Sequence, residues 1–189
     1  MEQNNGNIAL LVMDMQKGIL KNYPSARAQL EKAKDAIDSA RKRNIPVLFV
    51  RLGIRPGLPE INPNNKMLSG LRDRIGNGSV EEWMEIEQTI APLQNEIIIN
   101  KKRVSAFTGS DLEVILRSKG IQHVILSGVS TSGVVLSTLR EAADKDYKIT
   151  VLSDCCLDPD EEVHRVLTTK VFPRQAEVQT ADEWIKAGI

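Results

Sequence analysis

The sequence has no excess of charge of either sign and no long hydrophobic run. Lysine and arginine together number 25, and aspartate and glutamate also number 25, so the formal net charge is zero. Proteins that bind nucleic acid usually carry a basic excess, so we expect no nucleic-acid partner. The first apolar stretch, Ile8–Met13, is too short for a membrane span or for the core of a signal peptide. We therefore expect a cytoplasmic protein with no membrane partner.

Cysteine and histidine are also scarce. The two cysteines, Cys155 and Cys156, are adjacent, and neighbouring cysteines seldom form a structural disulfide because the geometry is strained. We interpret them as buried structural thiols in a reducing compartment. The two histidines, His123 and His164, lie at a predicted strand start and within a predicted helix, which is not the pattern of a metal-ligand set. The sequence therefore predicts neither a metal nor another cofactor.

The chain does contain enough apolar sequence to build a full core. Hydrophobic residues make up 41% and charged residues 26%, both near the averages for globular proteins, and we expect residues 1–189 to form one domain. Strand-like and helix-like patterns alternate, which is typical of parallel strands joined by right-handed crossovers with helices on both faces. The sequence thus predicts a three-layer α/β/α sandwich around a doubly wound, mainly parallel sheet of about six strands. The predicted strands are 8–13, 46–50, 96–99, 123–127, 149–152 and 176–179, and the predicted helices are 25–43, 111–118, 128–146 and 161–169.

Residues 52–92 break this alternation. Glycine and proline recur throughout the segment and interrupt any helical or strand period. Long irregular segments inside compact domains are often lids or binding loops. The alternative is a surface excursion with short helices, and the sequence leaves both open.

The polar residues that end the strands are the candidates for chemistry, because ligands of open parallel sheets bind outside the carboxyl ends of the strands. Asp14 directly follows an apolar strand, so its pKa tends to rise, which suits a general acid or base; alternatively it caps the next turn. Lys101 follows the third strand and can reach Asp14 across the sheet edge, unless it belongs to an ordinary basic turn. Arg51 ends the second strand and can bind a substrate carboxylate through its planar guanidinium, although a surface salt bridge is equally consistent.

Residues 128–134 form a turn of small residues before a predicted helix. Backbone N–H groups at a helix N-terminus suit an anion or a developing oxyanion. The turn is not a phosphate loop, since no Gly-Lys-Ser/Thr follows. It therefore supplies four candidate donors, which are Ser130, Thr131, Ser132 and Gly133.

Together these segments resemble the isochorismatase-like hydrolase superfamily, also called cysteine hydrolases. Residues 10–16 (LLVMDMQ) are similar to the family's strand with the catalytic aspartate. Lys101, four residues before the Ser-Ala-Phe of residues 105–107, is similar to the catalytic-lysine segment. Residues 128–131 (GVST) resemble the turn that carries a non-proline cis peptide, here between Val129 and Ser130.

The resemblance covers nearly the whole chain and implies a small-molecule substrate. It implies that Asp14 and Lys101 are catalytic and that Gln16, Arg51 and Phe107 shape the pocket. Family nicotinamidases carry an aspartate with paired histidines after the second strand, whereas residues 51–64 contain no histidine. The resemblance therefore implies neither a catalytic metal nor nicotinamidase activity, and it implies a homodimer or homotetramer.

One position departs from the family pattern. The nucleophilic cysteine lies three residues after the threonine of the turn, and the residue there is Val134, which cannot attack a carbonyl. Three interpretations remain. The first is acid-assisted hydrolysis, as in isochorismatases, where a small residue replaces the cysteine, the aspartate protonates an enol ether and water completes the reaction. The second is a silent family member that binds a small molecule. The third borrows a nearby hydroxyl without a histidine partner in view, from Ser130, Thr131, Ser132 or Ser137.

Overall fold

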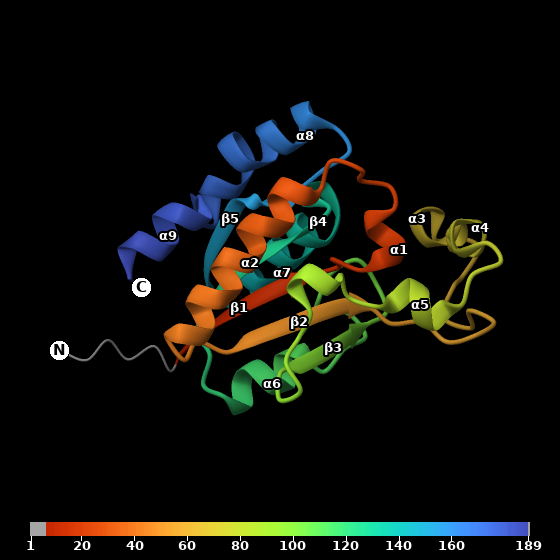
Figure 1. Cartoon of the computed structure of the whole chain (residues 1–189), viewed down its shortest axis with the longest axis horizontal. Helices are drawn as coiled ribbons and strands as arrows, with labels where there is room; N and C mark the ends of the chain where they lie inside the picture. Colours follow the sequence, from red (N-terminus) through yellow and green to blue (C-terminus); the bar gives the residue numbers. More distant parts are fainter. Residues whose placement is uncertain (1–6, 189) are drawn as a thin grey trace.

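The computed structural model describes residues 7–188, and their six strands form one sheet in which every pairing is parallel. The strand order is β3-β2-β1-β4-β5-β6, so the chain winds outward from β1 in both directions (Figure 1). The strands are β1 (Ile8–Met13), β2 (Val47–Leu52), β3 (Ile97–Lys101), β4 (His123–Val129), β5 (Lys148–Leu157) and β6 (Glu177–Gln179). The predicted doubly wound parallel sheet is confirmed.

Helices cover both faces of the sheet. They are α1 (Lys17–Leu20), α2 (Arg27–Lys42), α3 (Lys66–Ser69), α4 (Leu71–Ile75), α5 (Val80–Met84), α6 (Leu112–Ser118), α7 (Leu136–Asp144), α8 (Glu161–Val166) and α9 (Ala181–Ala187). Alternate residues of β1 feed two separate cores, because successive side chains of a strand point to opposite faces. Leu10 packs with α2 and α9, and Leu11 packs with α6 and α7. Figure 1 shows α2 lying along the sheet with α9 beside it.

The segment between β2 and β3 folds into short helices with a small core of its own. Leu58, Leu68, Leu71 and Trp83 pack together and against Leu52 at the end of β2. Figure 1 places α3, α4 and α5 beyond the ends of β1 and β2, on the side toward which the β2 arrow points. The segment, called the helical excursion below, lies over the carboxyl ends of the strands. It has the short helices of one alternative that the sequence left open, and it lies where the other alternative, a lid or binding loop, would lie.

Two predicted boundaries differ from the structure. β5 continues to Leu157 rather than ending near Leu152, because the register shifts between Leu126 and Gly128 of β4 and pairing then resumes at Cys156. The helix predicted over residues 128–146 begins instead with a π-helical turn at Thr131–Val135, and α7 follows. Register shifts and π-helical turns are irregularities in hydrogen bonding that the pattern of apolar residues does not report.

Candidate functional site

Asp14 and Lys101 meet at the carboxyl edge of the sheet. Asp14 follows β1, and Lys101 is the last residue of β3, two strands away in the order β3-β2-β1. The Lys101 ammonium lies 2.9 Å from Asp14 Oδ2, and only 2% and 9% of these side chains are exposed. Lys101 Nζ also donates a 2.7 Å hydrogen bond to the carbonyl of Arg103. The structure thus brings together the two residues that the sequence singled out.

The backbone at Asp14 is held in an uncommon conformation. Its φ is +57°, in the left-handed region that residues other than glycine seldom occupy, with aspartate and asparagine as the main exceptions. The N–H of Asp14 donates a 2.8 Å bond to the Val50 carbonyl of β2, which keeps the residue tied to the sheet. Such strained residues cluster at functional sites, where the surrounding structure holds a side chain in one direction.

One oxygen of Asp14 is left free. Oδ1 is buried and has no hydrogen-bond partner among the described residues. Burial raises the pKa of Asp14 above its ordinary value, and the Lys101 ammonium opposes that shift without cancelling it. The carboxyl therefore holds a proton more readily than an exposed aspartate, and Oδ1 is the oxygen without a hydrogen-bond partner among the described residues.

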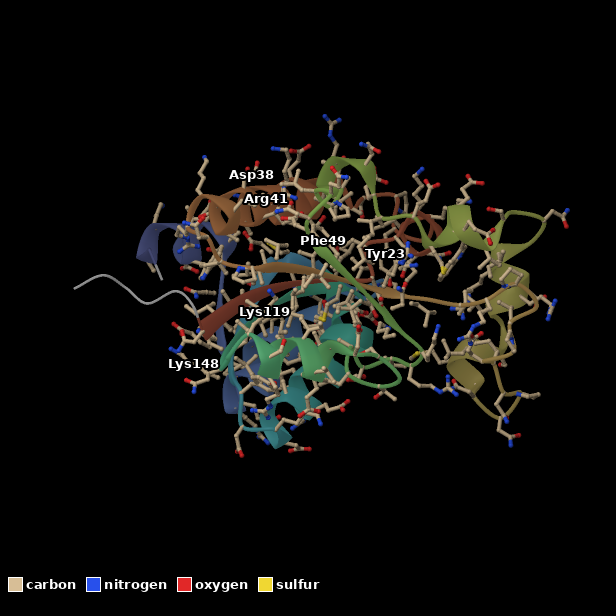
Figure 2. The ribbon with its side chains drawn as sticks, turned by 90° about the horizontal axis from the view of Figure 1, so that it is seen from below. Tyr23, Asp38, Arg41, Phe49, Lys119 and Lys148 are labelled. Atoms are coloured by element: carbon tan, nitrogen blue, oxygen red, sulfur yellow. The ribbon has the colours of Figure 1, made fainter. Side chains whose placement is uncertain are left out.

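A cavity of about 430 Å³ opens over this pair, a volume in the range of small-molecule sites. Its floor is the sheet edge, with Asp14, Lys101, Leu52 and Val129. The other walls come from the segment after β1, the helical excursion and the loop after β3, and they include Ile19, Asn22, Tyr23, Met67, Leu68, Leu71, Arg74, Trp83, Arg103 and Val104. Figure 2 shows Tyr23 toward the α3–α5 end of the molecule, away from Lys148 at the start of β5. The cavity is therefore built on the edge where ligands of this fold class bind.

The turn after β4 carries the expected cis peptide between Val129 and Ser130, and Val134 lines the cavity. Two of the four backbone donors predicted from this turn are in use. The N–H of Ser132 donates to Asp158 Oδ2 at 2.7 Å, and the N–H of Gly133 donates to the Ser130 carbonyl at 3.2 Å. The prediction that Ser132 and Gly133 offer free N–H groups to an oxyanion is therefore wrong, because a buried carboxylate and the turn itself already accept them.

Of the hydroxyl groups considered as nucleophiles near the turn, that of Ser130 belongs to a residue lining the cavity, whereas those of Thr131 and Ser137 do not. Thr131 is fully buried, and its Oγ1 lies 2.8 Å from His164 Nδ1, so the interpretation that no histidine is in reach is wrong. Neither Thr131 nor His164 lines the cavity, so this pair lies behind the turn rather than facing a ligand. Ser130 does line the cavity beside Tyr23, and burial raises the pKa of Tyr23 although the Ser130 side chain opposes that shift. Ser137 on α7 does not line it.

Three residues predicted to shape the pocket lie elsewhere. The Gln16 amide is buried and clamps the backbone of Leu52, accepting from its N–H at 2.8 Å and donating to its carbonyl at 3.2 Å. Phe107 belongs to the core under α6 and α7 and stacks on Tyr147 at a centroid distance of 6.0 Å. Arg51 donates to Asn100 Oδ1 at 2.7 Å. Because Leu52 faces the cavity, the neighbouring side chain of Arg51 points to the other side of β2.

The cysteines and histidines offer no second reactive centre. Cys155 and Cys156 are buried as expected, and burial raises the pKa of Cys156 to about 12 and that of Cys155 well above its ordinary value. Thiols of that kind are poor nucleophiles. His123 is buried with a lowered pKa of about 4, and its Nε2 lies 2.9 Å from Thr150 Oγ1. Across residues 7–188 no group of three or more His, Cys, Asp or Glu side chains is arranged to hold a metal ion.

Sequence reasoning missed the cavity residues of the helical excursion. Arg74 and Trp83 come from residues 52–92, whose path the sequence did not predict, and Arg103 lies two residues beyond the predicted lysine. The recurrence of glycine and proline marked the segment as a binding-loop candidate, but no pattern within it indicated which side chains turn inward.

None of the helices in the described part of the chain is long and apolar enough to cross a membrane.

Comparison with known proteins places this geometry in a family. A family model described as the isochorismatase domain matches residues 8–183. An uncharacterized isochorismatase family protein of Bacillus subtilis, YwoC, is 29% identical over 179 residues, which cover 94% of this chain and 92% of that one. The ureidoacrylate amidohydrolase RutB of Yersinia enterocolitica is 30% identical over 172 residues, which cover 77% of this chain and 73% of the relative. A solved isochorismatase family protein from Burkholderia thailandensis matches with a TM-score of 0.83 at 26% identity, covering 96% of this chain and 95% of that one.

Proposed function

Because this chain belongs to the isochorismatase family of hydrolases, we propose that it hydrolyses a small metabolite by acid assistance from Asp14, without a cysteine nucleophile. The observation that carries the proposal is the Asp14 carboxyl, which lines the cavity, is paired with the Lys101 ammonium and has a buried oxygen, Oδ1, without a hydrogen-bond partner among the described residues. Val134 stands where the family's nucleophile would be, and its methyl groups only fill space.

The chemistry that fits these groups is hydrolysis of an enol ether. A proton passes from the Asp14 carboxyl to the terminal carbon of the enol, which leaves an oxocarbenium ion. Water adds to that cation, loses a proton to the Asp14 carboxylate, and the resulting hemiketal breaks its C–O bond to release an alcohol and a ketone. Lys101 stabilises the carboxylate during the interval in which Asp14 is ionised, since it lies 2.9 Å away. Each proton returns to its source, so the cycle needs no cofactor.

Two N–H groups of the turn, those of Ser132 and Gly133, already have acceptors and are therefore not free to serve an acyl-transfer route. An amide or ester hydrolysis through a tetrahedral intermediate depends on free donors for the oxyanion. The N–H groups of Ser132 and Gly133 are bound to Asp158 and Ser130. Protonation by Asp14 places no such demand on the turn.

The experiment compares turnover by the wild-type chain and by Asp14→Asn on a panel of enol ethers, including isochorismate, with amides and ureas beside them. Asparagine also tolerates the left-handed backbone at this position, so the variant should fold. We expect enol-ether turnover that is abolished in Asp14→Asn and unchanged in Asp35→Asn, a control at an exposed aspartate of α2. Because Asp14 must be protonated, kcat/KM should fall as pH rises through its raised pKa. Turnover that survives in Asp14→Asn would refute the mechanism.

A binding protein is the second candidate, and the filled nucleophile position is the observation that favours it. Such a protein would bind ligands in the same cavity without turnover, and Asp14→Asn would change affinity alone. Mass spectrometry of the ligand after long incubation separates the two candidates, because only a hydrolase alters it.

A further inference from the structure

The loop that follows Lys101 is fastened to α7 by side chains that the proposed reaction does not use. This loop, residues 102–111, joins β3 to α6. Ser105 Oγ donates to Glu141 Oε2 at 2.6 Å, and Thr108 Oγ1 donates to the same oxygen at 3.2 Å. The N–H of Ala106 donates to Thr138 Oγ1 at 3.0 Å. Two side chains of one helix therefore accept hydrogen bonds from three residues of the loop.

The centre of this contact is shielded from water. Ser105 is 7% exposed, and Ala106 and Thr138 are fully buried. Ser105 Oγ also accepts from the N–H of Phe107 at 3.2 Å, so one hydroxyl both fastens the loop to Glu141 and shapes the loop backbone. Because a buried N–H group without an acceptor costs free energy, the loop cannot move away from α7 without a penalty at Ala106.

The loop in turn sets the position of the Lys101 ammonium. Lys101 Nζ donates to the Arg103 carbonyl at 2.7 Å and lies 2.9 Å from Asp14 Oδ2. An ammonium carries three donors on a flexible stem, so its place depends on where its acceptors are held. Arg103 is two residues from Ser105, the residue that Glu141 holds. A displacement of the loop would therefore change the distance between Lys101 and Asp14.

The same helix also carries the turn after β4. The π-helical turn Thr131–Val135 leads directly into α7, and Val134 of that turn lines the cavity with Lys101. Thr138 and Glu141 are three residues apart, so they lie on one face of the helix. Neither of them lines the cavity. One helix thus fixes the turn after β4 and the loop after β3 relative to each other, without touching a ligand through these two side chains.

We propose that Glu141 and Thr138 are positioning residues, which hold the Lys101 ammonium against Asp14 through the loop after β3. The inference rests on the proposed function in that it concerns the same Asp14–Lys101 pair, and it adds that the pair depends on hydrogen bonds to α7. In the described part of the chain, the one cation within 4.0 Å of the Glu141 carboxylate is Lys145, at 3.9 Å. The stronger contacts of Glu141 are therefore its hydrogen bonds to the loop.

The test follows the ionisation of Asp14 by ¹³C NMR of its carboxyl carbon, assigned by the loss of its signal in Asp14→Asn. The Lys101 charge lowers the pKa of Asp14 against the effect of burial, so an ammonium held less firmly raises the titration midpoint. We expect Glu141→Ala to raise that midpoint by about 1 pH unit. We expect Glu141→Gln to restore it, because the amide oxygen can accept from both hydroxyl groups.

The sign of the shift separates position from charge. If the Glu141 carboxylate acted on Asp14 through its own field, its removal would take away a like charge and lower the midpoint in both Glu141→Ala and Glu141→Gln. A fall of that kind, or an unchanged midpoint in Glu141→Ala, would overturn the proposal.

Glu113→Ala is the matched control. Glu113 on α6 also binds Lys145, at 2.6 Å, but its carboxylate accepts from Lys145 and Arg117 and not from the loop hydroxyls, so the midpoint should not move. Ser105→Ala removes the other partner of the 2.6 Å bond and should raise the midpoint as Glu141→Ala does. The double variant should shift it no further than either single variant, and fully additive shifts would contradict the shared bond. If circular dichroism shows Glu141→Ala to be unfolded, Ser105→Ala and Thr138→Val carry the same test.

Turnover is the second readout. On an enol ether that the chain hydrolyses, Glu141→Ala should lower kcat about tenfold or more with little change in KM, because Glu141 does not line the cavity, and Glu141→Gln should restore kcat. A change confined to KM would contradict the proposal.

The titration needs no substrate, so the two proposals fail separately. A raised Asp14 midpoint in Glu141→Ala without any turnover by the wild-type chain supports the positioning role and contradicts the hydrolase. Turnover that is lost in Asp14→Asn, with midpoint and kcat unchanged in Glu141→Ala, contradicts the positioning role and leaves the role of Asp14 intact.

Discussion

Removal of the Lys101 charge is the perturbation with the sharpest physical consequence. Lys101→Met keeps an unbranched side chain one atom shorter but leaves the Asp14 carboxylate buried without its partner, and it frees the Arg103 carbonyl. Breaking a buried ion pair by removing one partner costs about 3–5 kcal/mol. Because both side chains are less than a tenth exposed, we expect the free energy of unfolding at neutral pH to fall by about that amount.

The pH dependence identifies the cause of the loss. The pKa of Asp14 in the folded protein is raised above its ordinary value of 3.8, so the folded state binds more protons than the unfolded state between those two values, and stability falls as pH rises through that window. Without Lys101 the folded-state pKa rises further, and the window extends to higher pH. The difference in unfolding free energy between wild type and Lys101→Met should therefore grow with pH, with a constant part of about 1 kcal/mol from the Arg103 carbonyl.

The assay is urea denaturation followed by circular dichroism between about pH 5 and pH 8. Lys102→Met is the neighbouring control, because Lys102 is partly exposed and lies 3.7 Å from Glu60, and it should cost about 1 kcal/mol or less. The double variant Asp14→Asn, Lys101→Met should recover much of the loss, since neither charge remains buried alone. A deficit that is the same at every pH, or no larger than that of Lys102→Met, would refute the reasoning.

Three further predictions concern single positions. Val134→Cys places a thiol in the cavity that Lys101 also lines, and iodoacetamide should label it at neutral pH while labelling the wild-type protein far more slowly, as read by mass spectrometry. Gly18→Ala should destabilise the protein by about 1–3 kcal/mol and change its tryptophan fluorescence, because the added Cβ would lie 2.1 Å from the Trp83 ring; an unchanged spectrum and midpoint would contradict this packing. His123→Gln should lessen the loss of stability between about pH 6.5 and pH 4, because the lowered pKa of His123 makes the unfolded state the better proton acceptor there, and urea midpoints at the two ends would test it.

The fold and the central pair were predictable from local patterns. The unbroken apolar run of β1 indicates a strand buried on both faces, and both of its faces are in fact buried. Polar residues that end such strands must lie at one edge when the strands are parallel, so Asp14 and Lys101 could be expected in reach of each other. The strand between them, β2, contributes Leu52 to the floor of the same cavity.

The same reasoning went wrong where the direction of a side chain decides its role. Arg51 follows the strand predicted over 46–50 and meets the criterion that selected Asp14, yet β2 continues to Leu52 and the Arg51 side chain points to the other side of the strand. Phe107 lies close in sequence to Lys101, but the loop turns its ring into the core against Tyr147. Position at a strand end restricts a residue to one edge of the sheet. The direction of its side chain, set by the alternation along the strand and by the path of the following loop, determines whether it faces the cavity.

The sequence by itself determined the sheet and the two helical layers, which follow from residue type and local period acting over a few neighbours. It also predicted the edge at which a ligand would bind, and the family resemblance predicted that Val134 replaces the nucleophile. Only the tertiary structure decided that Arg74, Arg103 and Trp83 enclose the cavity, that His164 reaches Thr131, and that Asp158 occupies the N–H of Ser132. Those contacts join segments far apart in the chain, and they depend on how an excursion without a regular period packs over the sheet, which no local pattern encodes.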